Sequence, residues 1–404
     1  MKKLFQLNAC CIISLLLIFS VFLSSQKVET VDGVRVVHNE KTGKWGKNPK
    51  FSLEIVRRIG ELETEDENIA FHIPADIAID DKGNIYVLDA GNHRIQKFDA
   101  DGKYLATFGR RGQGPGEFYM PSSLDLDYQG YMYVSDPQNQ RVQILNPDGT
   151  EHKTIPFHQI PAGIIRVNKA GELVMGRGGI MIRISGGESD SQGLPKIIKV
   201  LDLEGNVQRE FGEAKEFKDE FIERNANAFH FALDKDDNVY VAFDFQNRIE
   251  KYSPDGQMLW SSDRDLSYST DLSKAKADVK RSGGNINVQM PQMNRCSNGI
   301  AVDDKGRVWV VNLKRQTKEE ERVGQSMMVS NAGGQRTMSL KLEGATDLRK
   351  TDMYQLEVYD QEGILLGTIP LTQFVDDIWI VKDRIFMLDK MRGAQFYEYR
   401  IIEK

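Results

Sequence analysis

The chain contains an internal repeat with a spacing of 47 residues. In the segments that begin at Ile73 and Met120, seven Pro, Gly and polar positions recur at this spacing. The matched pairs are Pro74/Pro121, Asp80/Asp127, Gly83/Gly130, Asp89/Asp136, Asn92/Asn139, Arg94/Arg141 and Gly102/Gly149. A repeat of this length is one supersecondary unit that cannot bury its apolar face alone. The copies must therefore pack on one another.

Each copy reads as four short strands separated by turn-forming residues. In the first copy the strands are DIAID, NIYVLD, RIQKFD and YLATFG, and the turns between them are DDKG, DAGNH and DADG. Apolar or alternating runs bounded by Asp, Asn and Gly predict strands joined by tight turns. Four strands in a repeat of about 40–50 residues match the pitch of a β-propeller blade.

Four weaker copies bring the total to six. They begin at Ile160, Ala228, Asn298 and Asp376, and the last supplies only three strands. The segment FSLEIVRRIG from Phe51 has no blade of its own and resembles the fourth strand YLATFG. The sequence therefore predicts an all-β fold: a six-bladed β-propeller of four-stranded antiparallel blades over residues 51–404. The N-terminal strand closes the last blade, which removes the open edges of the sheet series.

The segments outside the repeat have separate predictions. Residues 1–25 combine the basic start MKK with the apolar run CIISLLLIFSVFLSS, which is typical of a signal peptide or an N-terminal anchor. Residues 26–50 form a leader with a hairpin around Asp32-Gly33. Insertions of about 263–295 and 314–350 lie outside the ring. We therefore expect an exported protein, periplasmic, cell-envelope or extracellular, that meets a membrane only through an uncleaved N-terminal segment.

The net charge, the cysteine content and the absence of common catalytic motifs restrict the classes of function that this chain can have. The formal net charge is -6, which argues against nucleic acid as a partner because phosphate binding needs a basic excess. Cys296 is the one cysteine beyond the signal segment, so the mature chain cannot form an intrachain disulfide. The sequence also contains no Gly-x-Ser-x-Gly, HExxH or CxxC motif. The loop GRRGQGPGEFYMP lacks the ending of a phosphate-binding loop.

The repeat resembles the NHL repeat of bacterial six-bladed β-propeller proteins. The residues that carry the resemblance are Pro74, Asp80, Gly83, Tyr86, Asp89, Asn92, Arg94 and Asp101-Gly102, with their copies. The resemblance implies a fold and no activity, because propellers of this kind include scaffolds, receptors, lyases and lactonases. The recurring residues themselves predict structure: Asp89 and Asn92 pin a loop, and Arg94 reaches a carboxylate or carbonyls of the adjacent blade.

One ring of non-identical residues faces the channel. Alignment of the innermost strands places Asp76, Ser123, Gly163, His230, Gly299 and Asp376 at one height. We predict ligand contacts at the channel mouth from Asp76, Ser123, His230, Asn298 and Asp376. Asp76, His230 and Asp376 are also candidate ligands for zinc or calcium.

Two functions follow. The first is an exported binding scaffold without catalysis, which presents loops at one mouth to a protein, peptide or glycan. The alternative is a metal-dependent lyase or hydrolase with a channel site, distantly like peptidyl-amidoglycolate lyase or lactonase propellers. The zinc site of those lyases uses several His, and only His230, with His72 beside Pro74, approaches the channel here. The lactonase calcium set needs a Glu, and only Asn298, Asp76 and Asp376 match.

Overall fold

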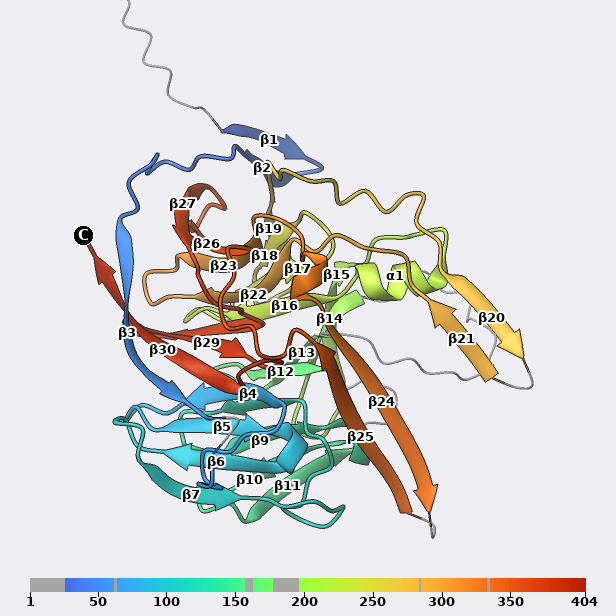
Figure 1. The fold of residues 1–404 in the computed structure, drawn as a ribbon. Coiled ribbons are helices and arrows are strands. Elements are labelled where there is room, and N and C mark those ends of the chain that lie inside the picture. Colours follow the sequence, from blue (N-terminus) through green and yellow to red (C-terminus); the bar gives the residue numbers. More distant parts are fainter. Residues whose placement is uncertain (1–25, 62–63, 157–162, 177–195, 283–284, 333–334) are drawn as a thin grey trace, which may run out of the picture.

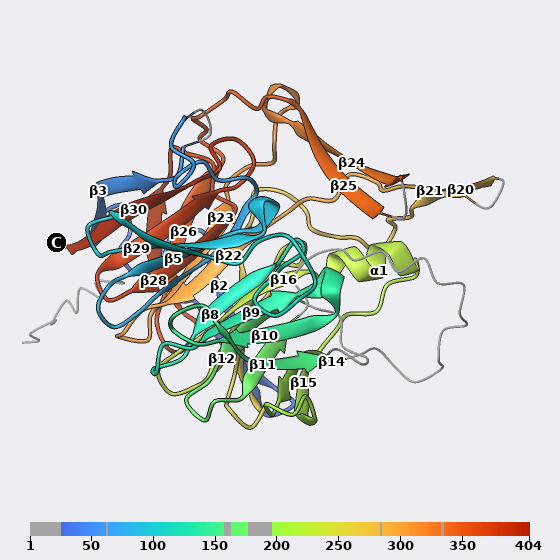
Figure 2. The same ribbon diagram turned by 90° about the horizontal axis from the view of Figure 1, so that it is seen from below.

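The structure is a computed structural model that describes residues 26–61, 64–156, 163–176, 196–282, 285–332 and 335–404. Six blades, each with four antiparallel strands, are arranged in a ring, and the sheet of blade four has two further strands; this confirms the predicted six-bladed propeller (Figure 1). Figure 2 shows the same ring from below, with the sheets packed face to face around it. The one α-helix among the described residues is α1 (Glu220–Ala226).

The first three blades follow the repeat in chain order. From the inner to the outer strand, blade one consists of β4 (Pro74–Ile79), β5 (Ile85–Asp89), β6 (Arg94–Phe98) and β7 (Tyr104–Phe108). Blade two consists of β8 (Ser123–Leu126), β9 (Met132–Asp136), β10 (Arg141–Leu145) and β11 (Glu151–Pro156). Blade three consists of β12 (Ile164–Val167), β13 (Leu173–Gly176), β14 (Lys196–Leu201) and β15 (Val207–Glu213). Short 3-10 helices, η1 (Ala90–Asn92) and η2 (Pro137–Asn139), connect the second and third strands of blades one and two.

The last three blades carry the additions to the repeat. Blade four consists of β16 (Phe229–Leu233), β17 (Val239–Phe243), β18 (Ile249–Tyr252) and β19 (Met258–Arg264). Blade five consists of β22 (Ser297–Val302), β23 (Val308–Leu313), β26 (Tyr354–Tyr359) and β27 (Leu365–Pro370). Blade six consists of β28 (Asp377–Val381), β29 (Arg384–Asp389), β30 (Gln395–Glu403) and β3 (Phe51–Ile59). The pairing of β3 with β30, from Phe51 opposite Glu403 to Ile59 opposite Phe396, confirms the predicted N-terminal closure.

Six buried apolar clusters join neighbouring blades around the ring. The cluster between the last and first blades shows how the ring closes, because Ile59 and Phe386 of blade six contact Ile77 and Val87 of blade one. Apolar burial on both faces of each sheet is the main stabilising contribution in such a ring. Each blade is therefore held to both of its neighbours by apolar packing.

The leader extends blade four. Strands β1 (Lys27–Val31) and β2 (Val34–Asn39) form a hairpin around Asp32-Gly33, and β2 pairs in parallel with β19. Asn39 is 3% exposed and anchors this addition. Its Nδ2 donates to Ser262 Oγ (2.7 Å) and Gly363 O (3.0 Å), and its Oδ1 accepts from Leu365 N (2.7 Å). The leader therefore bridges blades four and five, a contact that the sequence did not predict.

The two faces of the ring differ. Strand direction alternates within a blade, so connections between blades lie on the same face as connections between second and third strands. We call this the loop face, and the opposite face, with the tight hairpins, the turn face. The loop face carries α1 and two long hairpins, β20 (Asp278–Ser282) with β21 (Asn285–Gln289), and β24 (Val323–Ala332) with β25 (Gln335–Gly344). Figures 1 and 2 show both hairpins projecting on the side where α1 lies.

The recurring polar residues hold loops within the blades. Asp89 accepts hydrogen bonds from Asn92 (2.9 Å), Arg94 (2.8 Å) and the backbone N–H of His72 (2.7 Å). Arg94 also donates to Glu67 O and Ala70 O, in the connection that enters its own blade, at 2.6 and 3.2 Å. The contact of Arg94 with backbone carbonyls was therefore predicted. In blade one, however, these carbonyls belong to the connection that enters the blade and not to a strand of the adjacent blade.

Candidate functional site

The predicted ring of channel-facing residues exists, with two corrections to its register. Asp76, Ser123 and His230 lie at equivalent positions, opposite Leu88, Ser135 and Ala242 of the second strands. In the last blade the equivalent residue is Asp377, opposite Leu388, and not Asp376. The prediction failed there because the hairpin after β28 is shorter than that of blade one.

The third blade has the second correction. Ile164, and not Gly163, begins its inner strand, opposite Gly176. The alignment relied on the prolines before the strands, whereas blade one has a β-bulge between Pro74 and Asp76 that changes the count. Gly299 is at its predicted place, because a Cβ at Gly299 would lie 2.5 Å from Asp377 Oδ1.

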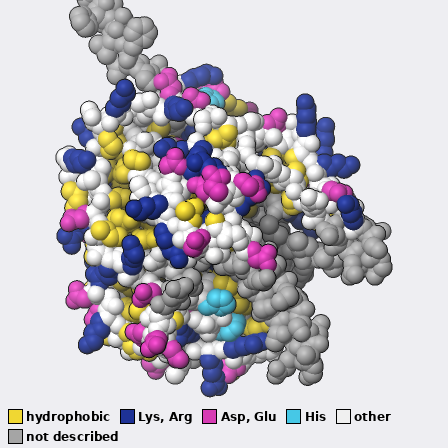
Figure 3. All heavy atoms as spheres, viewed as in Figure 1, with side chains coloured by type: hydrophobic (Ala, Val, Ile, Leu, Met, Phe, Trp, Pro, Cys, Tyr) yellow, Lys and Arg dark blue, Asp and Glu magenta, His cyan; other side chains and the backbone are white. Residues whose placement is uncertain are grey.

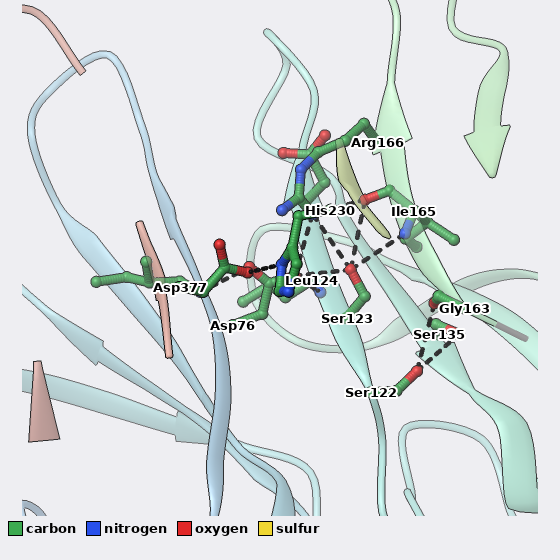
Figure 4. A network of polar contacts seen from close by, with 12 residues as sticks. Asp76, Ser122, Ser123, Leu124, Ser135, Gly163, Ile165, Arg166, His230 and Asp377 are labelled. Atoms are coloured by element: carbon green, nitrogen blue, oxygen red, sulfur yellow. Dashed lines mark hydrogen bonds and ion pairs between the residues drawn. The ribbon is translucent and has the colours of Figure 1, made fainter. Parts of the chain in front are cut away.

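Asp76 is the centre of the first polar network at the channel. Its Oδ2 accepts from Ser123 Oγ (2.7 Å), Leu124 N (3.1 Å) and Arg166 Nη1 (3.1 Å). Asp76 is 3% exposed, so its charge needs this guanidinium as a partner. Figure 4 shows Arg166 and Ser123 converging on Asp76 from separate strands. Sequence reasoning missed Arg166, which occupies the space that a metal ion at Asp76 would need.

His230 is the centre of the second network. Its Nδ1 lies 3.0 Å from Asp377 Oδ2, and its Nε2 lies 3.6 Å from Asp244 Oδ1 (Figure 4 shows the first contact). Burial alone lowers the pKa of His230, but the charges of Asp377 and Asp244 outweigh it and raise the pKa to about 9. Arg295 Nη2 donates to Asp244 Oδ2 at 2.8 Å. An imidazolium held between two carboxylates is a structural charge pair, not a general base near neutral pH.

The two remaining predicted residues hold the connection into the last blade. Asp376 Oδ2 accepts from the backbone N–H of Lys390 at 2.8 Å. Asn298 is 2% exposed, and its Nδ2 donates to Val375 O (2.9 Å) and Tyr354 Oη (3.2 Å). Asn298 thus has little access to a ligand, whereas Asp376 lies at the mouth beside Asp377.

The predicted metal set is not assembled. Asp76 is engaged by Arg166, His230 by Asp377, and Asp376 by a backbone amide. Within the ranges that the structure describes, no group of three or more His, Cys, Asp or Glu side chains is placed to hold a metal ion. The donor set for zinc or calcium therefore does not fit at Asp76, His230 and Asp376.

A groove on the loop face was missed by sequence reasoning. It has a volume of about 550 Å³ and lies between the segment that follows β21 in the first insertion and the base of the second insertion. Its lining is rich in methionine, aromatic and arginine side chains, chiefly Phe245, Met290, Met293, Arg295, Met353, Tyr354, Arg322 and Arg392. The segment QMPQMNR, from Gln289, was a usable signal, because two Met residues flank a Pro in an otherwise polar insertion.

Hydrogen bonds between the two insertions fix one wall of this groove. Arg295 N donates to Gln316 Oε1 (3.0 Å), and Gln316 Nε2 donates back to Arg295 O (2.8 Å). Arg315 and Glu321 then form a two-pronged ion pair, with both contacts at 2.6 Å. This guanidinium is the largest cause that lowers the pKa of Glu321, to about 2. The groove is therefore built on a rigid base.

Comparisons with known proteins agree with the fold. A family model described as 6-bladed beta-propeller matches residues 25–160. A Bacteroides fragilis protein described as a "Putative exported protein" aligns with a TM-score of 0.52 and 11% identity, covering 91% of this chain and 99% of that chain. A member of the DUF4221 family from Bacteroides vulgatus aligns with a TM-score of 0.54 and 10% identity, covering 88% and 99%. These identities support the fold alone.

The remaining comparisons add little about activity. A gluconolactonase from Xanthomonas campestris aligns with a TM-score of 0.46 and 13% identity, covering 87% of this chain and 95% of that chain, which is too distant to carry an argument. No curated protein matches the chain. Among the described residues, no helix has the length and apolar character needed to cross a bilayer.

Proposed function

We propose that this protein is an exported binding protein that holds a polypeptide segment in the methionine-lined groove of its loop face. One observation carries the proposal: the groove is the place where both insertions and blades four to six meet, and its lining is apolar and cationic at once. Loops on a rigid scaffold are the usual location of binding residues. The ring supplies the scaffold, and the insertions supply the specificity.

The lining favours a peptide over a glycan. Met290 and Met293 are only partly buried and pack on the small cluster of Ile222, Ala226 and Leu272 beside α1. Unbranched thioether side chains adapt to apolar side chains of different shapes, as peptide-binding grooves require. A saccharide would instead need many neutral donors and acceptors, whereas most of the residues that line this groove are apolar or charged.

The charge of the groove adds a second requirement. Arg295, Arg322 and Arg392 line it; Arg295 pairs with Asp244 and Arg322 with Glu319, whereas Arg392 has no ion pair among the described residues. The Nε atoms of Arg295 and Arg392 are buried without a hydrogen-bond partner in the described part of the chain. Guanidinium groups bind carboxylates strongly and with fixed geometry. The expected ligand therefore combines apolar residues with Asp or Glu.

The experiment is a selection of displayed peptides against the purified full chain, followed by affinity measurement. We expect enriched peptides to pair apolar with acidic residues, and Met293→Asp to weaken their binding at least tenfold. Met293→Leu should keep the affinity, which separates a specific effect from damage to the fold. Tyr128 lies on the turn face and is 79% exposed, so Tyr128→Asp is the matched control. Failure to enrich peptides, or equal binding to Met293→Asp, would contradict the proposal.

The metal-dependent lyase or hydrolase is not proposed. Its candidate residues Asp76 and His230 are each held by a charged partner from another blade, Arg166 and Asp377 respectively. These contacts account for the presence of the buried charges without a ligand.

A further inference from the structure

A second pocket lies at the outer rim of the loop face, between blades five and six. Its volume is about 380 Å³, within the range of small-molecule sites. Three cationic side chains and one carboxylate line it, with two tyrosines and several uncharged polar groups. The lining residues are Arg58, Glu61, Arg349, Lys350, Thr372, Gln373, Gly393, Gln395, Tyr397 and Tyr399. This pocket shares no lining residue with the methionine-lined groove.

The lining of this pocket has three cations and one carboxylate, that of Glu61. Arg58, Arg349 and Lys350 are exposed and form no ion pair among the residues that the structure describes. Elsewhere the molecule carries both signs interspersed on its surface, as Figure 3 shows for one face. A cationic surplus that is confined to one concave place favours an anionic ligand there.

The position of Arg58 leaves its donors available. Its guanidinium lies 5.5 Å from the centre of the Tyr397 ring, opposite Tyr397 in the pairing of β3 with β30. A cation–π contact orients the guanidinium through its face and does not use its N–H groups. Arg349 lines the same pocket, and its Nη1 donates to Thr346 O at 2.7 Å. Two guanidinium groups that line one pocket can clamp a carboxylate.

The floor of the pocket is polar and ordered. Gln395 Nε2 donates to Tyr397 Oη at 2.9 Å, and the rings of Tyr397 and Tyr399 are stacked with centroids 6.5 Å apart. Gly393 makes room for this arrangement, because a Cβ there would lie 2.3 Å from Gln395 Nε2. Amide, hydroxyl and phenol groups that both donate and accept suit the hydroxyl groups of a sugar. The partly buried Tyr399 adds an apolar edge.

We infer that this pocket binds an acidic saccharide, with the ring carboxylate between Arg58 and Arg349 and the sugar hydroxyls on Gln395, Thr372 and Tyr397. A bare phosphate or sulfate would use the cations and leave the amide and phenol groups idle. An acidic peptide would need apolar contacts, which this pocket offers only at Tyr399. The chemistry of the whole lining therefore favours a sugar that carries a carboxylate.

Calorimetric titration of the purified full chain with a galacturonic acid trisaccharide tests this inference. We expect the double variant Arg349→Gln/Lys350→Gln to weaken binding at least tenfold, and the neutral galactose trisaccharide to bind at least tenfold more weakly than the acidic one. Lys103→Gln removes one charge from an exposed residue of the turn face and is the matched control. Its affinity should equal that of the unmodified chain, and all variants should keep the same unfolding temperature.

Several results would overturn the inference. Equal binding of the neutral and the acidic trisaccharide would show that the pocket does not recognise the carboxylate. Equal or tighter binding of a peptide of Asp and Glu, or of inorganic sulfate, would show a plain anion site. Undetectable binding of the acidic trisaccharide would also contradict it. The methionine-lined groove is tested separately, because Met293→Asp should leave saccharide binding unchanged.

Discussion

Asp136 of blade two is the last residue of its second strand, and Asp244 of blade four directly follows the corresponding strand, but the two carboxylates contact different partners. Asp136 accepts from Tyr119 N (3.0 Å), Asn139 (2.7 Å) and Arg141 (3.2 Å), all within or just before its own blade. In blade four the equivalent arginine, Arg248, pairs with Glu250 at 3.3 Å instead. Asp244 is thereby left to Arg295 and His230 at the channel mouth.

This difference extends to the two halves of the ring. Blades one and two use their recurring polar residues to hold their own loops, in almost the same way at Asp89 and Asp136. Blades four to six lose that pattern and carry both hairpins, the methionine-lined groove and the pocket proposed for an acidic saccharide. Both proposed binding sites therefore lie where the repeat has diverged, as expected if function resides in the parts of a repeat protein that differ between copies.

The largest expected effect is on the regular half. Asp136→Ala should lower the free energy of unfolding by about 3–5 kcal/mol, because it leaves the mostly buried Arg141 and a backbone N–H without their partner. Chemical denaturation at pH 7 measures this. Asp136→Asn keeps an acceptor oxygen and should cost less than half as much. A loss below about 1 kcal/mol in Asp136→Ala would break the proposed division of roles.

The second effect concerns pH. The folded-state pKa of His230 is raised to about 9 from an ordinary value of 6.5, so its contribution is complete below pH 6.5 and disappears as pH rises through 9. The shift corresponds to about 3 kcal/mol. Unfolding free energies measured from pH 6.5 to 9.5 should therefore fall in the natural chain and fall less in His230→Gln. The exposed His152 provides the control, since His152→Gln should keep the full slope.

A third, smaller effect tests the brace on the diverged half. Asn39→Ala removes four hydrogen bonds between the leader and blades four and five, and should cost about 2–3 kcal/mol. Hydrogen exchange should show faster opening of β2 and β19, with blades one and two unchanged. An equal acceleration in all blades would mean that the leader acts on the whole ring.

The smallest effect is expected at Asp244, which directly follows the second strand of blade four. Asp244→Asn should cost only about 1 kcal/mol, because Arg295 is 38% exposed and water can replace part of the lost contact. It should also reduce the pH slope assigned to His230, since one of the two neighbouring carboxylates is gone. A cost as large as that of Asp136→Ala would show that both positions serve the same purpose.

The fold was predictable from the sequence, and the sites were only partly so. Pro74, Asp80 and Gly83 could be interpreted from the sequence because they form local turns, whose geometry depends only on residues nearby in the chain. Gly83 indeed has a φ of +84°. The closure by β3 was predictable because one blade lacked a strand and one strand lacked a blade.

The side-chain partners could not be predicted in the same way. The ring residues Asp76, Ser123 and His230 followed from the alignment, whereas Asp377 required the actual hairpin length. Arg166 and Arg295 were missed because their partners lie on other blades, 90 and 51 residues away along the chain. The two pockets depend on how the insertions fold against the ring, and the repeat pattern contains no information about the insertions. The resemblance to NHL repeats stays a prediction.

The most direct test of the account is hydrogen–deuterium exchange of the full chain with and without a peptide selected against it. The account predicts slower exchange at residues 290–295, 313–317 and 390–394, which surround the methionine-lined groove, and no change in the turns at 80–84 and 127–131. Protection confined to the loops of blades one and two, or to the turn face, would contradict the claim that the diverged half carries the binding surface.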